Sequence, residues 1–168
     1  MRRPSLLAAA VLAAWACAAG FPASAQQQEA GAGASRVEVV LSVAHKERLA
    51  SIKEEFARAG MPNVHIQFVR RGQPPQNLGL GRDVPAETAR EAIRLALKYN
   101  LGIGVLLPER LFPPRFITIA SSNFDDTVES SIDEAALSQL RQPELTTNEF
   151  HRLYRGFTSV PRALPGRY

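Results

Sequence analysis

The side chains best suited to catalysis are three histidines and a stretch of serines and aspartates. They are His45, His65, His151, Ser121, Ser122, Asp125 and Asp126. A nucleophilic serine needs a base within hydrogen-bond reach and donors for the oxyanion. No Gly-x-Ser-x-Gly elbow surrounds either serine. One hypothesis is a small hydrolase that uses Ser121 or Ser122 with a histidine and Asp125. The alternative, which we favour, is an ordinary turn without a catalytic residue.

The same residues do not have the spacing of a metal site. No two histidines follow a His-x-x-x-His pattern, and Asp125 and Asp126 lack the ligand spacing of a calcium loop. Cys17 is the only cysteine and lies near the N-terminus. We therefore expect no metal and no cofactor, and we interpret the histidines as structural.

A glycine pair before an expected helix is a candidate anion site. Gly79 and Gly81 flank Leu80, and three arginines lie nearby in the sequence, namely Arg70, Arg71 and Arg82. Backbone N–H groups at a helix N-terminus can bind a phosphate or carboxylate. The pattern is neither a dinucleotide fingerprint nor a phosphate loop. The alternative is a strand-to-helix connection that needs a positive φ.

The segment 107–114 is rich in proline and is the main candidate for partner binding. Leu111 and Phe112 lie between prolines, which stiffen a loop at low entropic cost. A stiff loop that presents Leu and Phe suits recognition of a partner. The alternative is that both side chains fold back onto the sheet. Phe150 and Tyr154, on an apolar stripe of the last expected helix, would pack on the domain or on the same partner.

Residues 1–25 are typical of a cleavable secretory signal peptide. Arg2-Arg3 opens the chain, an apolar stretch covers 6–16, and Ala23-Ser24-Ala25 gives the small-x-small cleavage pattern. The apolar stretch is too short for a membrane span. A twin-arginine signal and lipidation at Cys17 are the alternatives. We expect a periplasmic or secreted protein.

Cleavage after Ala25 would leave 143 residues without cysteine, which suits one domain. Removing Arg2 and Arg3 leaves 18 basic and 16 acidic side chains, with both signs interspersed. This balance does not favour a nucleic-acid partner. No later apolar run has the length of a membrane span.

The pattern of apolar residues predicts strands that alternate with helices. Alternation indicates strands over 37–43, 63–70, 76–81, 103–107 and 115–120. Helical spacing indicates helices over 45–59 and 85–99, the second opened by Pro85. This order predicts an α+β, two-layer sandwich with a mostly antiparallel sheet. Its core would be a ferredoxin-like βαββαβ unit, with an extra strand and two C-terminal helices.

The C-terminal part shows two helix starts. Ser131 and Glu134 form one potential capping box, and Thr146 and Glu149 form another. We expect a tether over 26–35, a core over 36–122, a helical extension over 123–158 and an irregular tail over 159–168.

These features favour an exported, non-catalytic binding or assembly module of the bacterial cell envelope. Its partner would be an envelope protein or peptidoglycan, and a homodimer is an option. The alternatives are the small hydrolase and small-anion binding at 79–82.

Overall fold

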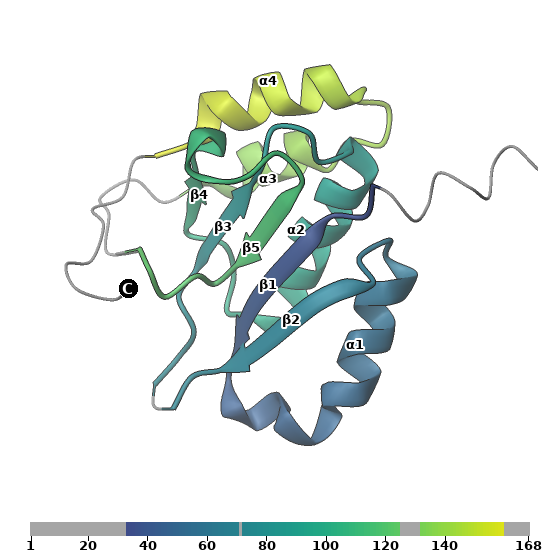
Figure 1. Ribbon diagram of the computed structural model, residues 1–168. Coiled ribbons are helices and arrows are strands. Elements are labelled where there is room, and N and C mark those ends of the chain that lie inside the picture. The colour runs from purple at the N-terminus through teal and green to yellow at the C-terminus, as the bar shows by residue number, and fades with distance from the viewer. Residues whose placement is uncertain (1–32, 71, 125–131, 160–168) are drawn as a thin grey trace, which may run out of the picture.

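A mixed five-stranded sheet forms the centre of the computed structural model, which describes residues 33–70, 72–124 and 132–159 (Figure 1). The strands are β1 (Arg36–Leu41), β2 (Asn63–Phe68), β3 (Asn77–Leu80), β4 (Val105–Leu107) and β5 (Phe116–Ile119). The helices are α1 (Leu49–Arg58), α2 (Ala86–Tyr99), α3 (Glu134–Leu140) and α4 (Thr147–Phe157). Short 3-10 helices cover η1 (Val43–Arg48) and η2 (Glu109–Leu111). The predicted α+β, two-layer class is confirmed.

The strand order is β2-β1-β5-β3-β4. β1 pairs in parallel with β2 and β5, β3 pairs in parallel with β4, and β3 and β5 are antiparallel. The expectation of a mostly antiparallel sheet is therefore wrong, and the ferredoxin-like plan is not confirmed. The physical reason is that α1 and α2 each return the chain to a strand directly beside the one it left. A split βαβ unit instead leaves room for another strand in between.

The alternation along β1 gives the sheet one covered and one open face. Val37, Val39 and Leu41 are buried on the side of α1 and α2, with Ile117 and Ile119 of β5. Arg36 and Glu38 point to the opposite side, which we call the open face. In Figure 1 the sheet lies in front of α1 and α2, while α4 runs across one end.

Local signals define the helix ends. Gly60 follows α1 with a φ of +78°, which a glycine adopts without strain. The capping box of Thr146 and Glu149 opens α4, as predicted. α3 begins later than expected, because the side chain of Asp133 accepts the Ala136 N–H at 2.7 Å; Ser131 lies outside the described residues. No helix in the described ranges is long and apolar enough to cross a membrane.

Charged side chains join the two helices on the covered face. The Glu55 carboxylate of α1 accepts hydrogen bonds from Lys98 at 2.6 Å, from Arg94 at 3.0 Å and from the Tyr99 hydroxyl. Desolvation opposes ionisation of Glu55, but these donors together outweigh it and lower its pKa from 4.5 to about 2. The ionised form of Glu55 therefore stabilises the folded state.

We predict that this stabilisation is complete above about pH 5 and is lost as the pH falls through 4.5 toward 2. Glu55→Gln should lower the free energy of unfolding by ~1 kcal/mol near pH 7, a figure reduced for solvent screening. It should have little effect near pH 2. Urea unfolding at both pH values measures this, with Glu54→Gln, an exposed neighbour on α1, as the control. Equal pH dependence of the two variants would contradict the assignment.

Candidate functional site

A hollow of about 500 Å³ lies on the open face, and we call it the aromatic hollow. Its side chains come from β1, β5 and the two loops that flank β5. They include Phe112, Phe116, Phe124, Arg36, Arg115, Glu38, Leu111 and Thr118. The volume lies within the range of ligand sites. No other face of the sheet is free for such a site, because α1 and α2 cover the opposite one.

Residues 108–114, here called the arch, form one wall by crossing the open face above β3. A Cβ atom at Gly79 would lie 2.4 Å from the Phe112 ring, and one at Gly81 would lie 1.9 Å from the Pro113 carbonyl oxygen. Neither distance is sterically allowed for a real side chain. Because Gly79 and Gly81 are two residues apart, both leave the same face of the chain bare. The arch therefore depends on these two glycines.

Backbone hydrogen bonds close this contact. The Gly81 N–H donates to the Phe116 carbonyl at 2.7 Å, and the Asp83 N–H donates to the Pro114 carbonyl at 2.8 Å. The positions around the glycines are thus paired with the arch and with β5. The arch is joined to the sheet by both packing and hydrogen bonding.

Three phenylalanines share one cluster within the hollow. The Phe112 ring stacks on Phe116 with centroids 5.9 Å apart and meets Phe124 edge-on at 6.0 Å. The Arg36 guanidinium lies 5.8 Å from the centre of the Phe116 ring and donates to Glu38 at 2.7 Å. The hollow thus combines aromatic walls with a charged rim.

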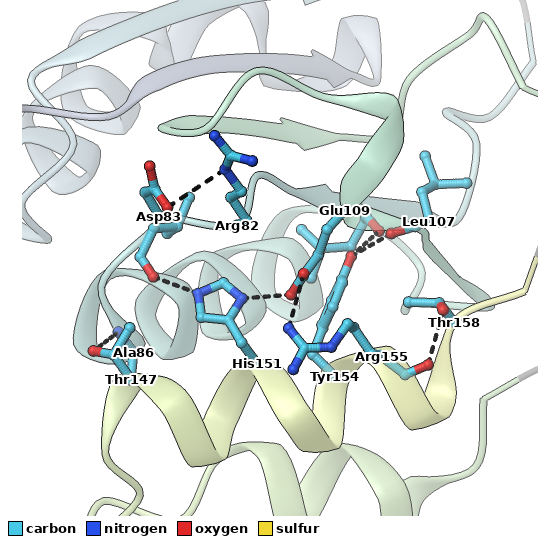
Figure 2. A network of polar contacts seen from close by, with 12 residues as sticks. Arg82, Asp83, Ala86, Leu107, Glu109, Thr147, His151, Tyr154, Arg155 and Thr158 are labelled. Atoms are coloured by element: carbon cyan, nitrogen blue, oxygen red, sulfur yellow. Dashed lines mark hydrogen bonds and ion pairs between the residues drawn. The ribbon is translucent and has the colours of Figure 1, made fainter.

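A buried polar network anchors the arch to α4 (Figure 2). His151 Nδ1 lies 2.5 Å from Glu109 Oε1, and His151 Nε2 donates to the Val84 carbonyl at 2.7 Å. Arg155 donates to the second Glu109 oxygen at 3.2 Å. A carbonyl oxygen can only accept, so Nε2 carries a proton, and the Nδ1–Oε1 contact then needs one further proton, on either the ring or the carboxyl group. Only 8% of Glu109 and 4% of His151 are exposed.

The far wall of the hollow begins at a strained residue. Ala120 directly follows β5 and has a φ of +60°, which is unusual for a residue other than glycine. The buried Asn77 amide accepts the Ser121 N–H at 2.8 Å and donates to the Ser121 carbonyl at 2.9 Å. This reciprocal pair holds the backbone turn. Strain of this kind is concentrated at functional sites, which adds to the case for the open face.

Of the three candidate histidines, only His65 lies near the candidate serines. His65, Ser121 and Ser122 line a smaller hollow of about 150 Å³. It shares four lining residues with the aromatic hollow, namely Glu38, Thr118, Ser121 and Asn123. Among the described residues, no hydrogen bond joins either serine to a histidine. The other two histidines are engaged elsewhere, His45 with the Tyr99 carbonyl and His151 with Glu109. Asp125 and Asp126 lie outside the described residues.

The anion-binding candidates are dispersed. Gly79 lies within β3, and α2 begins only at Ala86. Arg82 is largely exposed, with Asp83 3.7 Å away. Arg70 is exposed at the end of β2, and Arg71 lies outside the described residues. Gly79 and Gly81 have a packing role under the arch. Within the described ranges, no group of three or more acidic, histidine or cysteine side chains could hold a metal ion.

The partner-binding candidates fall into two groups. Phe112 folds back over Gly79, whereas Leu111 on the same arch stays 41% exposed at the rim of the hollow. Phe150 and Tyr154 are fully buried, and the Tyr154 hydroxyl donates to the Leu78 and Leu107 carbonyls at 3.1 and 2.8 Å. The stripe of α4 therefore packs on its own domain, and these two side chains have no surface to offer to a partner.

No local pattern in the sequence marks Glu109, Asn77 or the arginines of the hollow as parts of a site. A buried Glu109 gives no local signal, since its partner His151 is 42 residues away. The glycine pair did carry a signal. Two glycines separated by one residue within a strand leave a bare strip on one face, onto which another segment can pack.

We predict that Gly79→Ala displaces Phe112 and destabilises the domain by ~2 kcal/mol, as expected for overpacking. Gly104→Ala is a matched control, because a Cβ atom there meets nothing closer than 3.4 Å and the residue has no positive φ. Thermal unfolding followed by circular dichroism compares the two. A Gly79→Ala variant as stable as Gly104→Ala would show that Phe112 does not lie there.

We also predict that Glu109→Ala destabilises the domain by ~3 kcal/mol, because it leaves the buried His151 without its charged partner. Arg155→Ala should cost less than ~1 kcal/mol, since the Arg155 side chain is 57% exposed. Urea unfolding at neutral pH measures both. Equal effects would mean that the ion pair of Arg155, rather than the His151 contact, anchors the arch.

Comparison with known proteins adds no relative. No protein-family model matches the chain. No curated protein and no solved structure matches it either. The site is therefore interpreted from its own geometry.

Proposed function

We propose that this chain is an exported, non-catalytic binding module of the bacterial cell envelope, and that it holds a protein partner at the aromatic hollow. The observation that carries the proposal is the hollow itself, about 500 Å³ in volume, with three phenylalanines and two arginines around it. Aromatic and arginine side chains are enriched at the energetic centres of interfaces. The predicted signal peptide supports an envelope location.

The chemistry of the hollow favours a peptide segment. Phe112 and Phe116 stack on each other, so the two faces that meet are not available as a flat platform for a sugar ring. An apolar side chain from a partner would fill the hollow. Arg115 and Arg36 at the rim would favour an acidic neighbour, although Arg36 already pairs with Glu38. Peptidoglycan is the alternative partner, and the experiment below distinguishes the two.

A rigid scaffold supports recognition here. The arch is fixed by Gly79, Gly81 and Glu109, and the opposite wall is fixed by Asn77. A preorganised site loses less conformational entropy when a partner binds. The exposed Leu111 at the rim is then the side chain most available for first contact.

We predict that Leu111→Asp weakens partner binding at least ~10-fold and leaves the fold intact, because it replaces an exposed apolar contact beside the phenylalanines with a charge. Leu101→Asp is the control, since Leu101 is 65% exposed and does not line the hollow. A photo-crosslinking amino acid at each position in living cells, followed by mass spectrometry, identifies what lies there. Binding of purified chain to isolated wall sacculi is measured in parallel.

A protein crosslinked from position 111 but not from position 101, and lost on Phe116→Ala, supports the proposal. Sacculus binding that depends on Leu111 would replace the protein partner with peptidoglycan. Equal crosslinking from both positions would remove the hollow as the site.

A further inference from the structure

The two edge strands of the sheet differ in whether another segment of the chain pairs with their outer side. At the β4 edge, the chain's own C-terminal segment pairs with the strand, since Leu106 bridges Thr158 and the Ser159 N–H donates to the Leu106 carbonyl at 2.9 Å. At the β2 edge, no described segment pairs with the outer side of the strand. Exposed strand edges attract other strands unless charges, proline or a bulge protect them.

β2 lacks those protective features. Residues 63–69 contain no charged side chain and no proline. The strand pairs with β1 residue by residue from Asn63 to Phe68, without a bulge. Its three apolar side chains, Val64, Ile66 and Phe68, are only partly buried against the core. The β2 edge therefore has neither charges nor a bulge to protect its backbone, and its apolar side chains are only partly covered.

The hydrogen-bonding direction of β2 can be derived from one contact. The Val69 N–H donates to the Leu41 carbonyl of β1 at 2.9 Å, so the backbone of Val69 points inward. Backbone groups of successive strand residues point to alternate sides. The N–H and C=O groups of Val64, Ile66 and Phe68 consequently point outward. The residues with free outward backbone groups are the same three that carry the partly buried apolar side chains.

We propose that the β2 edge pairs antiparallel with β2 of a second copy of this chain, about a two-fold axis at Ile66, to form one continuous sheet. Ile66 would then face its own counterpart, and Val64 would face Phe68 of the other copy. Each of these pairs can exchange two backbone hydrogen bonds. On the open face His65 would face Gln67 of the other copy. Beyond the pair of Val64 and Phe68, Pro62 would lie opposite Arg70, so no like charges oppose one another along the strand.

The helix layer also fits this arrangement. α1 contacts β2 and lies beside α2, to which Glu55 is bonded. Because α2 contacts β5 and β3, side-by-side packing of the helices places α1 behind the β1–β2 side of the sheet (Figure 1). Two such helices in a continuous sheet would lie about two strand spacings apart, or ~10 Å. That is the ordinary distance between packed helices. The pairing would also place the two open faces on the same side, which brings two aromatic hollows to one surface. The inference does not rest on the proposed function.

The mass of the exported full chain, measured by sedimentation equilibrium from about 1 to 100 µM, tests the proposal. We expect a dimer for the native chain. Ile66→Lys and Ile66→Glu should each be monomeric, because like charges would oppose one another at the axis. An equimolar mixture of the two should regain the dimer. His65→Lys, whose backbone points toward β1, is the control and should remain dimeric.

Circular dichroism of each variant establishes that it is folded before its mass is interpreted. A monomeric native chain at 100 µM would overturn the proposal. So would an Ile66→Lys variant that stays dimeric, or folded lysine and glutamate variants that do not combine. A dimer that forms in the mixture, but in neither variant by itself, supports pairing centred on residue 66. Loss of folding cannot produce that result.

Discussion

The open face is organised by one steric constraint: the arch crosses the sheet where β3 has no side chains to meet it. Gly79 lies under the Phe112 ring, and Gly81 lies under the carbonyl oxygens of Pro113 and Pro114. A methyl group at either glycine would force the crossing segment away. That contact sets the position of Phe112, and Phe112 in turn stacks on Phe116 and meets Phe124. The aromatic hollow is thus a consequence of two missing Cβ atoms.

A second interaction fixes the arch from the side. Glu109 is buried and bonds to His151 of α4, while His151 also reaches the Val84 carbonyl ahead of α2. Three segments far apart in the sequence therefore meet through one imidazole ring (Figure 2). Buried ion pairs contribute little net stability relative to an apolar core, but they are strongly destabilising when broken. The network thus favours one arrangement of arch and helix over its alternatives.

Local signals in the sequence predicted the elements well and their arrangement poorly. The alternation in residues 37–41, the glycine after α1 and the capping box at Thr146 are each determined by neighbouring residues, and the structure confirms them. The strand ends at Leu41, earlier than predicted, and Val43 lies exposed in η1. The order of strands depends on contacts between distant segments, which is why the antiparallel, ferredoxin-like arrangement was not confirmed. Likewise, the burial of Tyr154 follows from carbonyls on β3 and β4 that no local pattern reveals. The arch was recognised from its prolines, but its crossing point was not.

Nuclear magnetic resonance of the labelled chain tests directly whether Phe112 lies against Gly79. We expect nuclear Overhauser contacts from the Phe112 ring to the Gly79 α-protons and to the Thr118 methyl group. We also expect a Gly79 α-proton shifted well upfield by the ring current. A Phe112 ring without these contacts, together with Gly79 α-protons at ordinary chemical shifts, would show that Phe112 does not pack on Gly79. The arch would then be a free loop, and the aromatic hollow would not exist in solution.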